Sequence, residues 1–224
     1  MGVLDGLAEL LAPTRCAGCE YPGSVLCARC LAALPRISHV DACPACAAPY
    51  GSLVCTECWN RSLAFEAALA LGELDGPLAR AVVLHKDAGE RRLGALLGSL
   101  LAEQVCAQWP GWPDAVTWVP ATDAARARRG FDHARALGAP LADACGVPLP
   151  GLLGRRAAKD QRALGRRERA ENSAGTFVVR GEVPRRVLVV DDVLTTGATL
   201  DAAAEALVEG GAAAVRIAVV ARAW

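Results

Sequence analysis

Residues 187–200 read VLVVDDVLTTGATL. The first four are apolar and mostly β-branched, which is typical of a strand buried inside a parallel sheet. Two adjacent carboxylates, Asp191 and Asp192, stand at the end of this strand, and a Thr-Gly turn then opens a helix expected over 199–208. In α/β folds, ligands bind at the carboxyl ends of parallel strands. The stretch therefore predicts a ligand site at the edge of an α/β sheet.

The residue types of this turn suit a phosphorylated ribose. Exposed N–H groups and hydroxyls at a helix start bind a phosphate monoester, and Gly197 lets the backbone approach it closely. The paired carboxylates can hold two vicinal ribose hydroxyls, with Mg²⁺ near a pyrophosphate. Either half of the pattern alone is commonly an ordinary helix cap, so the prediction depends on both together. The expected ligand-binding residues are Asp191, Asp192, Thr195, Thr196, Gly197, Ala198 and Thr199.

The chain on either side of this stretch alternates strands and helices. Hydrophobic residues make up 53% of the sequence but aromatic residues only 4%, so the core must be aliphatic. A strand, a crossover helix and a parallel strand form the repeating unit of α/β proteins. We therefore expect a doubly wound parallel sheet flanked by helices. Further strands are predicted over 65–71, 115–119, 176–179 and 214–220, and further helices over 77–85, 92–107 and 132–145.

The N-terminal region is rich in cysteine. Eight of the ten cysteines form four Cys-x-x-Cys pairs, and such pairs in a reducing compartment usually hold metal. Each pair places two thiolates on one edge of a zinc tetrahedron, and a loop of seven or eight residues can bring the next pair round. Sequential pairing closes the shorter loops, although an interleaved arrangement remains open. The expected zinc ligands are Cys16, Cys19, Cys27 and Cys30 in one site, and Cys43, Cys46, Cys55 and Cys58 in the other.

The zinc has three candidate roles. A structural metal would give this short region a fold that its small core could not hold alone. The alternatives are a DNA-binding finger and a catalytic metal. Four thiolates leave no open coordination position and the surrounding residues are acidic, so a structural role is favoured. The remaining cysteines, Cys106 and Cys145, are expected to be small buried hydrophobic residues.

The composition changes near residue 60. We expect a cysteine-rich zinc-binding domain over 1–62 and a second domain over 63–224. Residues 1–75 carry four Lys/Arg and eight Asp/Glu, while residues 76–224 carry twenty and sixteen, so the N-terminal region would repel nucleic acid. The sequence has no long apolar run and no basic start of a secretory signal, which predicts a cytoplasmic protein without membrane insertion.

The joint pattern resembles the phosphoribosyl-pyrophosphate motif of type I phosphoribosyltransferases. Fused to a cysteine-knuckle N-terminus, it resembles the ComF family, named for competence for DNA uptake. Supporting motifs cover nearly the whole chain: His85-Lys86 with Gly89, Val119-Pro120, Arg129-Gly130-Phe131, and the series from Gln161 to Asn172.

The resemblance implies a fold, a ligand and two candidate functions. The fold is that of a type I phosphoribosyltransferase, and the ligand is phosphoribosyl pyrophosphate with Mg²⁺. Pro120 and Ala121 occupy the pyrophosphate-loop position, with Lys86 and Arg129 as further contacts, and residues 155–172 form a loop that covers the site. In an enzyme, Asp191 and Asp192 would position the ribose for transfer to an unknown acceptor. In the alternative, the same fold handles single-stranded DNA in uptake or repair, with little or no turnover.

The sequence departs from the family pattern in two places. The loop between Val119 and Gly130 is shorter than is common and lacks the usual second proline. The usual Gly-Phe-Asn-Gln reads Gly-Phe-Asp-His over residues 130–133. His133 could be a general acid or base, but a histidine at a helix start beside Asp132 is more often a cap or a surface residue. We therefore expect no catalytic role for it.

A basic stretch over 155–169 has three interpretations. It is a solvated helix face with internal ion pairs, a surface that captures pyrophosphate or a phosphorylated acceptor, or a groove for single-stranded DNA. Such a groove normally includes stacking aromatic residues, and only Phe131 and Phe177 lie near in sequence. The basic residues are Arg155, Arg156, Lys159, Arg162, Arg166, Arg167 and Arg169.

Overall fold

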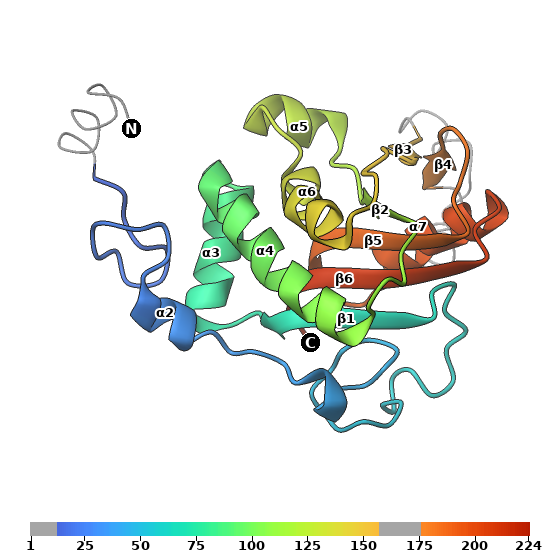
Figure 1. Ribbon diagram of the computed structural model, residues 1–224, viewed down its shortest axis with the longest axis horizontal. Coiled ribbons are helices and arrows are strands. Elements are labelled where there is room, and N and C mark those ends of the chain that lie inside the picture. The colour runs from blue at the N-terminus through green and yellow to red at the C-terminus, as the bar shows by residue number, and fades with distance from the viewer. Residues whose placement is uncertain (1–12, 157–175) are drawn as a thin grey trace, which may run out of the picture.

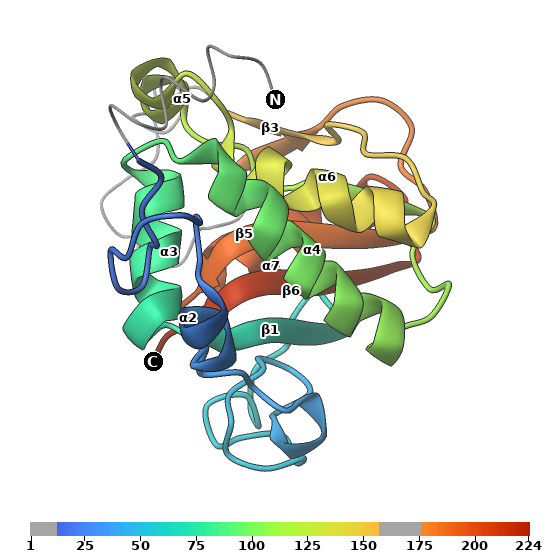
Figure 2. The same ribbon diagram turned by 60° about the vertical axis from the view of Figure 1, so that its left-hand side comes forward.

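The computed structural model describes residues 13–156 and 176–224 (Figure 1). A four-stranded parallel sheet lies at its centre, with strand order β1-β6-β5-β2. Helices cover both of its faces (Figure 2). The doubly wound α/β class is therefore confirmed. In chain order the elements are α2 (Ala28–Ala32), the 3₁₀ helix η1 (His39–Asp41), β1 (Ala67–Glu73), α3 (Gly76–Lys86), α4 (Arg91–Gln108), β2 (Ala115–Trp118), α5 (Asp123–Arg129), α6 (His133–Cys145), β3 (Leu153–Arg155), β4 (Phe177–Val179), β5 (Arg186–Leu194), α7 (Ala198–Glu209) and β6 (Ala214–Arg222).

Successive side chains of the central strands point to opposite faces of the sheet, which divides the core into two halves. On β5, Val187 and Val189 face α7, while Leu188 and Val190 face α3, α4 and α6. All four side chains are fully buried, as expected of a strand covered on both faces. Strand β5 pairs with β2 on one side and β6 on the other, so its carboxyl end lies at the middle of the sheet edge.

The two cysteine-rich segments pack against different parts of this core. The first knuckle, residues 16–30, joins the half that contains α3 and α4. The second knuckle, residues 43–58, joins the half that contains α7. The chain between them runs along the edge of β1, where Ile37 donates its N–H to the carbonyl of Leu71. Both knuckles therefore share hydrophobic contacts with the sheet domain, and the predicted boundary at 62/63 stays a prediction.

The structure differs from the sequence expectations in a few elements. Residues 123–129, expected to be a basic loop, form α5, which Thr122 caps by accepting from the N–H of Ala125. Strand β3 was not predicted, and it pairs antiparallel with β4. Strand β5 continues to Leu194, so the two carboxylates lie within it and not at its end.

Two cysteines lie outside the knuckles. Cys106 on α4 and Cys145 on α6 are half-buried, and their sulfur atoms lie 3.7 Å apart. They are therefore neighbours in space, although the sequence separates them. Among the described residues, no helix combines the length and the apolar character that crossing a membrane requires.

Candidate functional site

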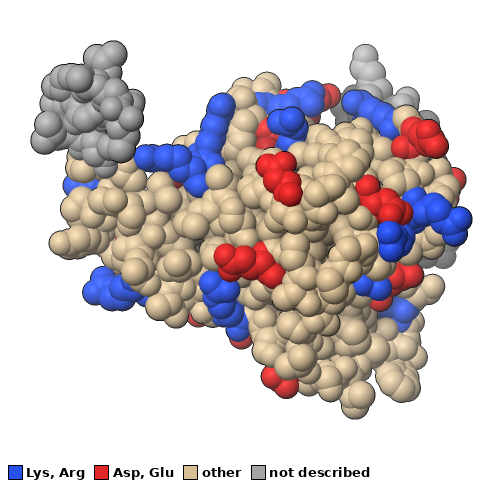
Figure 3. Space-filling model, in the orientation of Figure 1, with Lys and Arg blue, Asp and Glu red and all other residues tan. Residues whose placement is uncertain are grey.

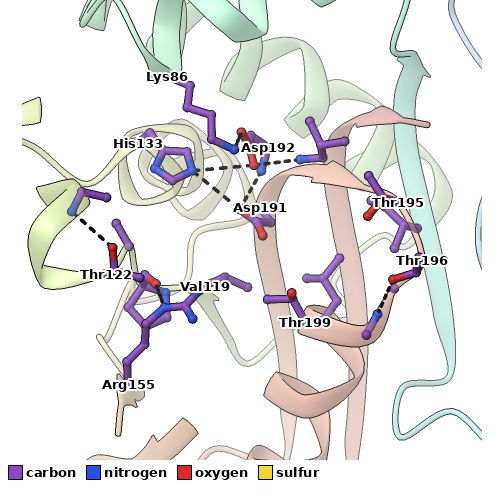
Figure 4. Close-up of a pocket in the computed structure, with 18 of the residues that line it drawn as sticks. Lys86, Val119, Thr122, His133, Arg155, Asp191, Asp192, Thr195, Thr196 and Thr199 are labelled. Atoms are coloured by element: carbon purple, nitrogen blue, oxygen red, sulfur yellow. Dashed lines mark hydrogen bonds and ion pairs between the residues drawn. The ribbon is translucent and has the colours of Figure 1, made fainter. Parts of the chain in front are cut away.

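A cavity of about 350 Å³ opens at the carboxyl edge of the sheet. Its walls come from the end of α3, the loop after β2, the start of α6, β3 and the turn from β5 into α7 (Figure 4). The structure thus brings all the residues predicted to bind a sugar pyrophosphate into one pocket. They are Lys86, Pro120, Ala121, Arg129, Asp191, Asp192, Thr195, Thr196, Gly197, Ala198 and Thr199.

The turn after β5 presents polar groups to this pocket. Gly197 is the N-cap of α7 and has a φ of 82°, a left-handed conformation that glycine adopts without strain. Thr195, Thr196 and Thr199 are exposed on the pocket wall. We call residues 194–199 the phosphate loop, because a helix start with hydroxyls and backbone N–H groups suits an anion.

The acidic pair lies on the opposite wall and is buried. Lys86 places its Nζ 2.6 Å from Oδ2 of Asp192, and Oδ1 of the same carboxylate lies 3.6 Å from Nε2 of His133. Burial opposes ionisation of Asp192, but the hydrogen bond from His133 and the charge of Lys86 outweigh it and hold its pKa below the ordinary value. Burial and the charge of Asp192 raise the pKa of Asp191 well above its ordinary value. The pocket therefore favours ionisation of Asp192 over that of Asp191.

His133 corrects the sequence expectation. It is buried, with 6% of its surface exposed, and it faces the acidic pair, while the cap of α6 is Asp132. Its Nδ1 lies 3.2 Å from a guanidinium nitrogen of Arg129. Because a guanidinium can only donate, Nδ1 accepts and the proton of the neutral ring is on Nε2, which points toward Asp192. The sequence showed that His133 lies at a predicted helix start. It did not show in which direction the side chain points.

Arg129 carries an unsatisfied buried group. Its outer nitrogens contact His133 and, at 3.1 Å, Oδ1 of Asp87. Within the described parts of the chain, its Nε is buried without any hydrogen-bond partner. A buried donor left unpaired is destabilising, and an anion in the pocket would relieve it. Arg129 therefore marks the side of the pocket where an anionic group fits.

The loop after β2 is held by polar contacts of its own. The N–H of Ala121 donates to Oδ2 of Asp132 at 3.2 Å, and Arg155 donates its Nε to the carbonyl of Pro120 at 2.8 Å. The Ala121 N–H is thus engaged within the protein. Arg155 lines the pocket and Arg156 does not. The other predicted basic contacts, Lys159, Arg162, Arg166, Arg167 and Arg169, lie outside the described residues.

Two clusters of four cysteines form from the sequential quartets, as favoured from sequence. In each cluster the sulfur atoms lie within 4.8 Å of one another. The pairs Cys19/Cys27 and Cys46/Cys55 have sulfurs 3.7 Å apart, close to the edge of about 3.8 Å that Zn–S bonds of about 2.3 Å give a tetrahedron. Burial acts to raise the pKa of Cys16, but N–H groups of Cys27, Cys19 and Gly18 lower it to about 6. Both donor sets fit a structural metal with no open position.

The Phosphoribosyl transferase domain family matches residues 127–223, which include α6, the acidic pair and the phosphate loop. The match indicates that this part of the chain is a phosphoribosyltransferase-type domain. The chain is 29% identical over 223 residues to the "DNA utilization protein YhgH" of Salmonella typhi, covering 93% of this chain and 96% of the relative. It is 26% identical over 196 residues to the "Competence protein ComFC" of Streptococcus pneumoniae, covering 86% of each chain. With the matched domain, these relatives support the resemblance of the chain to the ComF family of phosphoribosyltransferase-fold proteins.

Solved phosphoribosyltransferases resemble part of the chain. The purine phosphoribosyltransferase from Pyrococcus horikoshii is 19% identical, with a TM-score of 0.37, and the match covers 58% of this chain and 73% of that chain. The adenine phosphoribosyltransferase from Leishmania donovani is 22% identical, with a TM-score of 0.37, covering 59% and 53%.

Proposed function

We propose that the protein binds phosphoribosyl pyrophosphate with Mg²⁺ in this pocket and transfers the phosphoribosyl group to an acceptor. The observation that carries the proposal is the convergence of three groups in one cavity: an acidic pair, the phosphate loop and the unpaired Nε of Arg129. The chemistry of each suits one part of the ligand. A cytoplasmic location stays a prediction.

Each wall would hold a different part of the ligand. Asp191 and Asp192 accept hydrogen bonds from the two vicinal ribose hydroxyls, and the phosphate loop takes the 5′-phosphate. Arg129 and Arg155 face the pyrophosphate, whose departure from C1 leaves an oxocarbenium-like ribose. Lys86 is bonded to Asp192 and keeps that carboxylate charged. Mg²⁺ would neutralise pyrophosphate oxygens next to the carboxylates, whose oxygen atoms are ligands it prefers.

Ligand-dependent stabilisation tests the binding. Phosphoribosyl pyrophosphate with Mg²⁺ should raise the melting temperature of the wild-type protein through mass action. The double change Asp191→Asn with Asp192→Asn should abolish that rise while the circular dichroism spectrum stays native. Asp143→Asn, an exposed change on α6, is the matched control and should leave the rise intact. Equal stabilisation of the wild type and the double variant would place the ligand elsewhere. Release of pyrophosphate with candidate acceptors then tests turnover.

A second candidate function is the handling of single-stranded DNA. The observation that favours it, against the acidic charge of the N-terminal region, is a set of exposed aromatic side chains at the second knuckle: Tyr50, Trp59 and Trp224 are each more than half exposed. Exposed rings are stacking platforms for bases, whereas Phe177 is buried beneath Arg155. Two relatives are also named for DNA utilization and for competence. The face drawn in Figure 3 intersperses basic and acidic side chains, without a continuous basic track.

Anisotropy of a labelled oligonucleotide tests this candidate. Affinity should fall with salt at roughly 0.7 per neutralised phosphate on a log–log plot. Trp59→Ala should weaken binding by about 1–3 kcal/mol, because one stacked base is lost. Val83→Ala, which removes an exposed apolar side chain on α3, is the control. No detectable binding at low salt would exclude the candidate.

A further inference from the structure

The peptide groups of the phosphate loop are fixed from behind by two arginines. Arg222, at the end of β6, donates to the carbonyls of Leu194 and Thr195 at 3.1 and 2.8 Å. Arg61, three residues after the second knuckle, donates to the carbonyl of Thr196 at 2.9 Å. Three consecutive carbonyls of the loop therefore face these two guanidinium groups.

Fixing these carbonyls also fixes the N–H groups of the loop. In a planar trans peptide the C=O and the N–H of the next residue point in opposite directions. The N–H groups of Thr195, Thr196 and Gly197 are consequently directed away from the arginines. All three residues line the pocket. The arginines thus determine which way the anion-binding donors point.

The same arginines connect the loop to the second knuckle. Arg222 donates its Nε to the carbonyl of Cys46 at 2.9 Å. Its side chain lies against Trp224, whose ring packs on Tyr50 of the knuckle. A third link joins the N–H of Ala64 to Oδ1 of Asp201 in the first turn of α7, at 2.8 Å.

The charge of Arg222 needs this knuckle. Only 3% of the residue is exposed, and within the described residues its hydrogen bonds go to carbonyls, with no carboxylate in an ion pair with it. A buried cation without a countercharge is costly. Four thiolates around one zinc ion carry a net charge of about −2, which would supply the countercharge next to Arg222.

We propose that the second knuckle sets the conformation of the phosphate loop, with Arg222 and Arg61 as the positioning residues that connect the two. The inference rests on the proposed function in so far as the loop binds a phosphate. The first knuckle differs: its contacts go to α3, where Arg80 donates to the carbonyl of Gly18 and pairs with Glu20. Loss of metal from the second site alone should therefore loosen the loop.

Matched cysteine variants test the connection without any ligand. Cys55→Ser and Cys27→Ser each remove the third, half-buried cysteine of one quartet, and elemental analysis should show the loss of one zinc from each. Hydrogen exchange of peptides covering 193–200 should accelerate at least about tenfold in Cys55→Ser and stay within about twofold of wild type in Cys27→Ser. Peptides from α4, on the other face of the sheet from α7, should be unchanged in Cys55→Ser. Unaltered loop exchange in Cys55→Ser, or equal acceleration in all peptides, would overturn the proposal.

Two arginine variants test the positioning role itself. Arg222→Lys keeps the charge but cannot reach all the carbonyls, so loop exchange should accelerate and affinity for phosphoribosyl pyrophosphate should fall about tenfold. Arg61→Ala, at an exposed residue whose loss should not unfold the protein, should give a smaller effect of the same kind. Arg80→Lys at the first knuckle is the control for both. If neither Arg222→Lys nor Arg61→Ala changes loop exchange, the inference is wrong.

The outcomes separate this inference from the proposed function. Absence of phosphoribosyl pyrophosphate binding by the wild-type protein would overturn the proposed function, while loop exchange in the ligand-free protein would still decide the connection. Tight binding of phosphoribosyl pyrophosphate by the wild-type protein, with unaltered loop exchange in Cys55→Ser, would support the proposed function and overturn the connection.

Discussion

His133 lies between the positive and the negative side of the pocket. Its Nδ1 faces Arg129 and its Nε2 faces Asp192 and Asp191, at 3.6 and 3.9 Å. A neutral imidazole in this tautomer accepts at one end and donates at the other, so it can orient both partners without adding charge. Its position at the first residue of α6 fixes the ring, because the helix is packed against α4.

A glutamine can make the same two contacts as this histidine, and the usual family motif, Gly-Phe-Asn-Gln, has glutamine at this position. Its carbonyl can accept from Arg129 and its amide can donate to Asp192. We expect His133→Gln to keep the affinity for phosphoribosyl pyrophosphate within about threefold, and His133→Leu to lower it about tenfold by removing both bonds. Isothermal titration of the two variants measures the difference. Equal losses in both would show that the imidazole itself is required.

Arg129 is the residue for which charge and geometry can be separated. Its unpaired Nε and its two outer nitrogens form a fork, which lysine cannot reproduce. Arg129→Lys should lower the affinity for phosphoribosyl pyrophosphate about tenfold, since one charge-assisted bond is lost. Arg128→Lys, at the exposed neighbour, is the control and should bind as wild type. Unchanged affinity in Arg129→Lys would mean that the anion does not use this donor.

At the scale of elements, α6 reaches the site only because it packs closely on α4. A Cβ added at Gly98 of α4 would collide with the carbonyl of Leu137 and lie 3.0 Å from Cγ of Pro140, both on α6. A Cβ added at Gly94 would lie 3.1 Å from Cβ of Ala136 on α6 and would also collide with His85 of α3. The glycines of α4 therefore set the distance between the two helices and, with it, the position of His133.

Gly98→Ala should accordingly destabilise the protein. Overpacking of this kind costs about 1–3 kcal/mol of unfolding free energy, even though alanine is the better helix former. Ser99→Ala, on the exposed side of the same helix, loses only a hydrogen bond to the carbonyl of Ala95 and should change stability little. Urea denaturation monitored by circular dichroism compares the two. A Gly98→Ala protein as stable as wild type would show that the helices move apart freely.

The long helices and strands were predictable because the apolar residues in each recur with the period of that element. The strand over 214–220 and the helices over 77–85 and 92–107 appear close to their expected bounds, while the strand expected over 187–190 continues to Leu194. Strand β3 has three residues, too few to show a period, and exists through pairing with β4. Helix α5 is itself a basic stretch without an apolar face, so its sequence resembles a loop.

The site was predictable where one local motif carries it. The acidic pair and the phosphate loop are contiguous in sequence, and the cysteine quartets have a fixed spacing. The contact of His133 with Asp192, and that of Arg222 with Leu194 and Cys46, join segments far apart in the chain. No local pattern records which way such side chains point, and only the folded chain determines it.

At the scale of the whole molecule, the two knuckles belong to the same core as the sheet. Cys16 and Cys30 are buried with Leu78 of α3, and Cys43 and Cys58 with residues of α7. Four neighbouring thiolates without metal repel one another, and protonated thiols give no cross-link. Removal of both metals should therefore weaken the entire domain and not only its N-terminal part.

Chelation measures that dependence. We expect about two zinc ions per chain by elemental analysis, with Cys106→Ser and Cys145→Ser leaving the number unchanged because those cysteines lie outside both clusters. Removal of the metal with a strong chelator should lower the melting temperature in a single transition; a loss of about 5 kcal/mol corresponds to roughly 10–20 °C for a chain of this size. Calorimetry of the loaded and stripped protein under reducing conditions gives both numbers. A stripped protein that melts at the original temperature, or fewer than one zinc per chain before chelation, would contradict a structural role for the metal, and recovery of the original melting temperature on adding Zn²⁺ is the expected control.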